Sequence, residues 1–164
     1  MDFIYIGDIV NTHGIKGEVR ILSDFKYKEC VFLKSTNLYI GSNKEKMVIN
    51  SYRKHKMFDL ITFDGINNIN DVLIYKGDKV YIKRDEISIN GYYNEDLIGM
   101  DVYGNDLYVG KVFDIVNNGI YDIFVIKNND VKNFIPNVSE FILQIDLENH
   151  RIDINVIDGL INEN

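Results

Sequence analysis

The chain has 164 residues, a length that allows one full domain or two small ones. Its apolar content of 46% is typical of a folded protein, and 18 Lys+Arg against 25 Asp+Glu give a net charge of −7. A single cysteine, Cys30, excludes an internal disulfide framework and a cysteine-rich zinc site. No apolar run reaches the ~18–20 residues of a membrane span, and the amino-terminal sequence has no secretory signal. We therefore expect a cytoplasmic protein with no membrane association and no cofactor.

The composition favours strands, because 26 Ile, 14 Val, 11 Tyr and 9 Phe stand against 10 Leu and no Ala. In the first half, apolar and polar residues alternate in short segments that end at Gly, Asn, Asp or Lys clusters. The segment at 69–77 breaks this rhythm and predicts a short helix, capped by Asn70 and ended by Gly77. Six strands and one helix predict a small closed barrel. The predicted strands are 3–10, 17–22, 37–40, 46–52, 57–63 and 79–84.

The second half also has the alternation of strands, and its charge differs sharply from that of the first. Residues 1–84 carry a net charge of +4 and residues 85–164 a net charge of −11. We therefore predict two domains with different partners, 1–84 and 92–164, joined by a polar linker at 85–91. The basic domain is the better candidate for contact with a phosphate backbone. The predicted strands are 98–102, 109–116, 121–127, 132–135 and 151–157, with 141–150 either a strand or a helical turn.

The densest local feature is THGIKGEVR at 12–20. Gly14 and Gly17 predict a tight loop between two strands, with His13 and Lys16 at its tip and Arg20 on the following strand. Such a loop suits a phosphate group. The alternative is a structural β-turn with solvated charges. Neither common nucleotide-binding glycine motif occurs here.

A basic run, Arg53-Lys54-His55-Lys56, lies between two predicted strands. We interpret it as a hairpin turn. Its cations either are solvated or make a second contact with RNA phosphate through Arg53, Lys54 and Lys56.

Adjacent tyrosines, Tyr92 and Tyr93, follow the linker. On a strand they would face opposite sides, so that one packs in a core and the other is available to a protein partner. The alternative is that both pack in the seam between the domains.

The sequence contains little evidence for a catalytic site. His13 with Glu18 could form a general-base pair, but no nucleophile motif accompanies them. We expect Cys30 to be a small buried apolar side chain and not a reactive thiol. The three histidines have no metal-site spacing. We expect no enzyme, no catalytic residues and no metal.

Several motifs in order resemble the ribosome maturation factor RimM family over nearly the whole chain. The amino-terminal motif is GDIVNTHGIKGEV at 7–19, and FDGINNINDVLIYKGDKVYI follows at 63–82. The second half contributes YYNEDLIGMDVYGND at 92–106, LYVGKVFDIVNNGIYDIFVI at 107–126 and FIPNV at 134–138. The ending DLENHRIDINVIDGLI at 146–161 also corresponds to the family pattern.

This resemblance implies an all-β protein with two small barrels, a translation-factor-like barrel followed by a PRC barrel, and one short helix in the first domain. It also implies a non-enzymatic chaperone of late 30S assembly and 16S rRNA processing. Such a factor binds rRNA and, in the head region of the immature subunit, a ribosomal protein of the S19 family.

By motif position, the resemblance assigns an rRNA- or ribosome-binding loop and a ribosomal-protein surface. Tyr92 and Tyr93 belong to the second. We expect a monomer, and the open alternative is a general protein-interaction module without RNA. The loop residues are His13, Gly14, Lys16, Gly17, Glu18 and Arg20.

Overall fold

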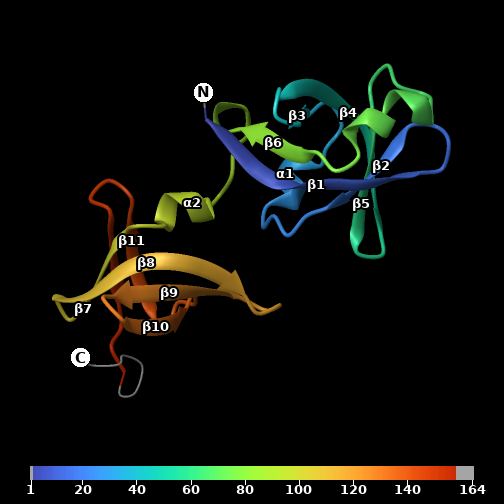
Figure 1. Cartoon of the computed structure of the whole chain (residues 1–164). Coiled ribbons are helices and arrows are strands. Elements are labelled where there is room, and N and C mark those ends of the chain that lie inside the picture. Colours follow the sequence, from blue (N-terminus) through green and yellow to red (C-terminus); the bar gives the residue numbers. More distant parts are fainter. Residues whose placement is uncertain (1, 158–164) are drawn as a thin grey trace. The chain divides into compact units, whose positions relative to one another are not determined.

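The computed structural model describes residues 2–157 (Figure 1). The chain divides into two compact units, Met1–Asn90 (unit 1) and Gly91–Asn164 (unit 2), and each is built around its own β-sheet. The prediction of an all-β protein with a short helix in its first part is confirmed. The two units are described separately below.

Unit 1 is a closed antiparallel barrel with the strand order β1-β2-β5-β4-β3-β6. Alternating side chains of these strands point inward, and the inward set is mainly Ile, Val and Leu. Each fully buried side chain of this kind contributes roughly 1.5–3 kcal/mol to the free energy of unfolding. The strands are β1 (Phe3–His13), β2 (Glu18–Leu22), β3 (Asn37–Ile40), β4 (Glu45–His55), β5 (Phe58–Phe63) and β6 (Lys79–Lys83).

Strand β1 closes the barrel because it pairs with β6 along its first half and with β2 along its second. Irregular register between Tyr5 and Gly7, and again between Ile9 and Asn11, bends the strand from one neighbour to the other. Gly7 lies at the bend, where a Cβ would stand 2.8 Å from the carbonyl oxygen of Leu22. A larger residue at position 7 would therefore force the strands apart.

Two irregular segments complete unit 1. Helix α1 (Lys28–Val31) buries Val31, and the next residue, Phe32, is also buried and stacks on Tyr52 of β4. The helix predicted at 69–77 is instead a pair of 3-10 turns, at Ile69–Asp71 and Leu73–Tyr75. Its cap is Asn68, whose side chain accepts a hydrogen bond from the backbone N–H of Asn70, so the prediction of Asn70 as the cap is wrong.

Unit 2 is a six-stranded sheet with the order β10-β9-β8-β7-β12-β11. Strand β12 runs parallel to β7, whereas the other pairs are antiparallel. Its core contains Leu97, Phe124, Ile126 and other buried side chains. The elements are α2 (Asn94–Leu97), β7 (Asp101–Gly104), β8 (Leu107–Asn117), β9 (Asp122–Asn128), β10 (Val131–Pro136), β11 (Ile142–Asp146) and β12 (Arg151–Ile154).

Tyr92 and Tyr93 precede a helical turn and do not lie on a strand, because Tyr93 is the residue before α2 and the chain turns into that helix there. One local prediction is wrong. The run at 53–56 is not a turn as a whole. Residues 53–55 continue β4, and the turn begins only at Lys56, whose φ of +56° lets two residues connect β4 to β5.

Candidate functional site

The hairpin between β1 and β2 presents the glycine-rich loop that the sequence singled out. His13 and Glu18 form its last strand pair, and four residues connect them. Gly14 and Gly17 have φ values of +70° and +92°, a conformation that other residues adopt only at a cost. Between these glycines, Ile15 is 76% exposed and Lys16 is also exposed. The loop therefore projects Lys16 from the barrel, as predicted, whereas His13, also predicted at the tip, is half-buried at the end of β1.

The tip of this hairpin is held in place by the segment that follows β5. The backbone N–H of Ile69 donates a hydrogen bond to the carbonyl of Ile15 at 3.0 Å. Gly17 is buried, and a Cβ there would lie 3.0 Å from Cγ2 of Ile66 and 3.3 Å from the backbone nitrogen of Asn68. The two motifs at 7–19 and 63–82 thus meet in space. A tip held in this way loses little conformational entropy when a ligand binds.

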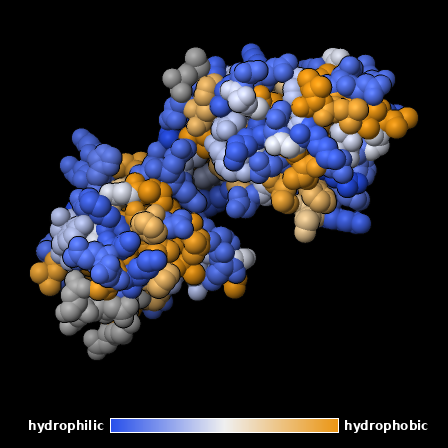
Figure 2. Space-filling model, viewed as in Figure 1, coloured by the Kyte–Doolittle hydropathy of each residue, from blue (hydrophilic) through white to orange (hydrophobic). Residues whose placement is uncertain are grey.

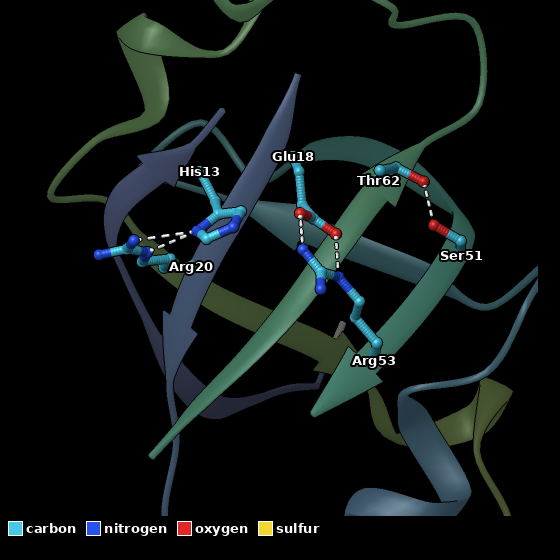
Figure 3. Close-up of polar contacts among 6 residues, drawn as sticks. All are labelled: His13, Glu18, Arg20, Ser51, Arg53 and Thr62. Carbon is cyan, nitrogen blue, oxygen red and sulfur yellow. Dashed lines mark hydrogen bonds and ion pairs between the residues drawn. The ribbon is translucent and has the colours of Figure 1, made fainter. Parts of the chain in front are cut away.

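Arg20 lies beside His13 on the outer face of the same hairpin (Figure 3). Its Nε and Nη2 lie 3.2 and 2.9 Å from Nδ1 of His13, and its guanidinium lies 5.6 Å from the ring centre of Phe58. No carboxylate forms an ion pair with Arg20 within residues 2–157. Its positive charge is therefore oriented by neighbours that do not neutralise it.

Glu18 and Arg53 form a two-pronged ion pair between β2 and β4 (Figure 3). The two nitrogen–oxygen distances are 2.8 and 3.1 Å. The hydrogen bonds from Arg53 lower the pKa of the Glu18 carboxyl, an effect that burial partly opposes. The pair neutralises Arg53, so this residue is a weaker candidate for phosphate contact than Arg20.

His55 joins this face from the end of β4. Its ring centre lies 5.4 Å from that of His13. Desolvation lowers the pKa of His55, and Coulomb interaction with His13, Lys56 and the nearby arginines lowers it further. Although the sequence suggested an exposed turn, strand register places His55 opposite Phe58 and beside the hairpin. We call the surface made by His13, Lys16, Glu18, Arg20, Arg53, His55 and Lys56 the hairpin face.

Lys54 does not lie on the hairpin face. It alternates to the other side of β4, where its ammonium is 3.6 Å from Oδ1 of Asp59. Asp59 is fully buried and also contacts Lys28 of α1 at 2.8 Å and the hydroxyl of Tyr52 at 2.7 Å. Lys54 therefore belongs to a group that ties α1 to the barrel, which favours a structural role over contact with RNA.

The tyrosine pair packs within unit 2. Tyr93 is buried, and Tyr92 is half-buried against the core, with its hydroxyl 3.5 Å from the carbonyl oxygen of Ile145. The apolar side chains that unit 2 exposes lie elsewhere, among them Phe113 and Phe134 at 54% and 58% exposure. Figure 2 shows such apolar side chains among hydrophilic ones at the surface.

Two lysines lie over Phe113, and a third stands in the same row, although unit 2 is strongly acidic. Lys111, Lys127 and Lys132 lie directly opposite one another on β8, β9 and β10. The ammonium groups of Lys127 and Lys132 are 4.9 and 5.5 Å from the ring centre of Phe113, and Lys111 is paired with Asp101 at 2.7 Å. The sequence does not reveal this row, because it depends on strand register.

Neither a metal site nor a membrane helix is found between residues 2 and 157. No group of three or more His, Cys, Asp or Glu side chains there could hold a metal ion. No helix in that range is long and apolar enough to cross a bilayer.

By its fold, the chain is an all-β protein of two units, with a candidate RNA-binding face on the first. Comparison with known sequences identifies the family to which it belongs. The family description "RimM N-terminal domain" matches residues 4–87, and "RimM PRC barrel domain" matches residues 94–160. Together they span most of the chain. The chain belongs to the RimM family of ribosome maturation factors.

Whole proteins of the family are similar over their full length. The ribosome maturation factor RimM of Staphylococcus haemolyticus is 39% identical, over 96% of this chain and 98% of its own. The RimM of Streptococcus mutans is 36% identical over 100% of both chains. Among solved structures, a 16S ribosomal RNA processing protein RimM from Pseudomonas aeruginosa covers 95% of this chain and 98% of its own, with 20% identity and a TM-score of 0.43.

Proposed function

We propose that this protein assists late maturation of the 30S subunit and processing of 16S rRNA by binding the immature particle, without catalysing a reaction. Its relatives are named ribosome maturation factors, which supports the general role. The hairpin face is the observation that best supports a contact with RNA. On this face, Lys16, Arg20 and other cations lie around the single carboxylate of Glu18, and hydrogen bonding and packing hold the loop in place.

Unit 1 contacts rRNA phosphates through this face. Lys16 extends from the tip, and Arg20 keeps an unneutralised guanidinium beside it. Gly14 lets the backbone approach a ligand closely, Gly17 packs against the segment at Ile66 and Asn68, and Glu18 holds Arg53 in place. Phosphate contacts of this kind supply affinity and position without reading sequence. Arg53 and Lys56 serve as secondary contacts, and Lys54 contributes indirectly through Asp59.

Unit 2 binds a ribosomal protein of the S19 family in the head region. The net charge of −11 on residues 85–164 complements a basic protein and accelerates encounter with it. Tyr92 contributes its accessible edge to the surface, and buried Tyr93 fixes the backbone beside it. We propose that the factor acts as a cytoplasmic monomer.

The mechanism is a shift in population. A factor that binds an immature conformation more tightly than the mature one favours the immature form by that difference in binding free energy alone. Because the mature head binds the factor more weakly, the factor dissociates when the head is complete. No chemical step is needed for such a role.

Co-sedimentation with free 30S subunits, 50S subunits and 70S ribosomes over a salt series tests the RNA contact. We expect selective migration with free 30S subunits, weakening as salt rises. Lys16→Glu should weaken binding about threefold to tenfold and reduce the salt slope by about one. The matched control is Lys34→Glu, an equal charge change at an exposed lysine outside the hairpin face. Equal losses in both variants would mean that only net charge matters.

Titration of a purified S19-family protein with the full chain tests the protein contact. Tyr92→Ser should weaken binding, whereas Tyr108→Ser, at a tyrosine that is 45% exposed on β8, should not. Thermal melts of both variants establish that unit 2 remains folded. Binding to unrelated proteins with equal affinity, and no preference for 30S subunits, would favour a general interaction module.

A further inference from the structure

A second surface of unit 1 combines aromatic rings with lysines. Phe3 and Tyr5 on β1, Tyr81 on β6 and Tyr39 on β3 share the outer side of the barrel, because Tyr5 pairs with Tyr81 and Tyr81 pairs with Tyr39. Their inward neighbours along the same strands, such as Ile4 and Ile82, are buried in the core. We call this surface the aromatic–lysine face.

The four rings form a continuous edge-to-face group. The ring centres of Phe3 and Tyr39 are 5.3 Å apart, those of Tyr5 and Tyr81 are 6.0 Å apart, and those of Phe3 and Tyr81 are 6.4 Å apart. Tyr5 is 47% exposed, Phe3 and Tyr81 are half-buried, and Tyr39 is buried. The rings are therefore fixed by one another, while part of the area of Tyr5, Phe3 and Tyr81 stays open to solvent.

Lysine ammonium groups lie over the flat faces of these rings. Lys44 is 4.1 Å from the ring centre of Tyr81, Lys79 is 4.6 Å from that of Tyr5, and Lys83 is 4.8 Å from that of Tyr39. These contacts are cation–π interactions. Each lysine comes from a strand or turn beside its ring, so positive charge alternates with aromatic area across the surface.

The carboxylates near this surface lie at the edges of the rings. Asp8 accepts a hydrogen bond from the hydroxyl of Tyr5, and Glu86 accepts one from the hydroxyl of Tyr39 at 2.6 Å. Asp24 and Asp85 act on the same two tyrosines only through longer electrostatic contact. The ring faces thus meet ammonium groups, and the carboxylates orient the hydroxyls.

The aromatic–lysine face is distinct from the hairpin face. In the closed barrel, β6 and β3 are separated from β2 and β5 by β1 on one side and by β4 on the other. The cations of the two faces therefore project from different sides of unit 1.

We propose that the aromatic–lysine face binds unpaired RNA nucleotides, with bases stacking on the rings of Tyr5 and Tyr81 and phosphates contacting Lys44, Lys79 and Lys83. The choice of RNA as the partner rests on the proposed function. Alternation of aromatic area with lysine complements a single strand, which offers stacking faces and phosphates at similar spacing. A duplex hides its base faces, so it could use only the lysines. Flexible lysine side chains can leave the ring faces when a base approaches.

Binding of the full chain to a labelled twelve-nucleotide oligouridylate tests this inference, with a twelve-base-pair RNA duplex as the second probe. We expect tighter binding of the single strand, about tenfold weaker in Tyr5→Leu and about threefold weaker in Lys44→Gln or Lys79→Gln. The matched control is Lys127→Gln, which removes the same kind of lysine–ring contact in unit 2 and should leave affinity unchanged.

A second measurement does not depend on whether a variant folds. With ring-labelled tyrosine in the unsubstituted protein, the resonances of Tyr5 and Tyr81 should shift on addition of oligouridylate. Unshifted rings, or equal binding of duplex and single strand with no loss in Tyr5→Leu, would overturn the inference. A normal oligouridylate response together with unaltered 30S binding in Lys16→Glu would instead count against the hairpin face alone.

Discussion

Unit 1 and unit 2 are both built from β-strands, but they differ in which side chains they bury and which they expose. In the described part of the chain, eighteen apolar side chains are buried in unit 1 and eleven in unit 2, whereas eight large apolar side chains are exposed in unit 1 and eleven in unit 2. The closed barrel leaves few apolar groups outside and covers its outer sides with cations. Unit 2 instead combines acidic turns with exposed Phe113 and Phe134.

This difference teaches that net charge alone does not describe either surface. Unit 1 neutralises several of its cations internally, through Glu18 and Asp59, and leaves Lys16 and Arg20 for a ligand. Unit 2 collects most of its few cations in the row of Lys111, Lys127 and Lys132, two of which lie over Phe113. The arrangement of charges therefore gives unit 1 two candidate RNA surfaces, the hairpin face and the aromatic–lysine face, and leaves unit 2 as the candidate for the protein contact.

The largest expected effect tests whether the two units fold independently. Phe124→Ala empties a fully buried site in the smaller core and should cost about 3–5 kcal/mol of unfolding free energy. Unit 2 should then unfold in urea while the barrel keeps its circular dichroism and its oligouridylate binding. The control, Phe134→Ala at an exposed position of the neighbouring strand, should change stability by no more than about 0.5 kcal/mol. Loss of both units in one transition would show that they are coupled.

A smaller effect should be confined to unit 1. Asp59→Asn removes the charge that pairs with Lys28 and Lys54 and weakens the hydrogen bond from Tyr52, and it should cost about 2–3 kcal/mol. The estimate is at the low end for buried pairs because Lys28 is 26% exposed and can regain water. Urea unfolding measures the loss, with Asp64→Asn as an exposed control. An unchanged midpoint would mean that α1 does not depend on this charge.

A further effect, which appears only at high pH, is a loss of unit 1 stability in alkali. Burial, followed by hydrogen bonds to carboxylates, raises the pKa of Tyr5, Tyr39 and Tyr52 to about 12. A raised pKa means that the folded state favours the protonated hydroxyl. The contribution is therefore complete below the unfolded value of 10.0 and is lost as the pH rises toward 12.

Urea midpoints across that pH range, followed together with tyrosinate absorbance, measure this loss. Tyr39→Phe should reduce the pH dependence, because it removes the hydroxyl that donates to Glu86. If the urea midpoint of unit 2 falls with pH as steeply as that of unit 1, the loss in alkali would not come from these three tyrosines of unit 1.

Local pattern was sufficient to predict the hairpin and most strands. The spacing of Gly14 and Gly17 predicted the loop that projects Lys16, because positive φ values are a local property of glycine. The partners of the loop were not predictable in the same way. Arg53 reaches Glu18, and His55 reaches His13, only because the register of β2, β5 and β4 brings residues some forty positions apart together.

The sequence also could not show which of two adjacent tyrosines is buried. The helical turn at Asn94–Leu97, which follows Tyr92 and Tyr93, places Tyr93 in the core and leaves Tyr92 half-buried. For Lys54, the sequence showed a basic run but not the buried carboxylate that it meets. The aromatic–lysine face was likewise hidden, because its rings come from three strands that are far apart in sequence.

The close contact between Gly17 and Ile66 has a consequence for how the sequence can change over time. A Cβ at position 17 would lie 3.0 Å from Ile66 and 3.3 Å from the backbone of Asn68, and the φ of +92° would strain any side chain there. A smaller residue at position 66 would relieve the first contact but not the backbone strain. Position 17 should therefore remain glycine even where position 66 varies.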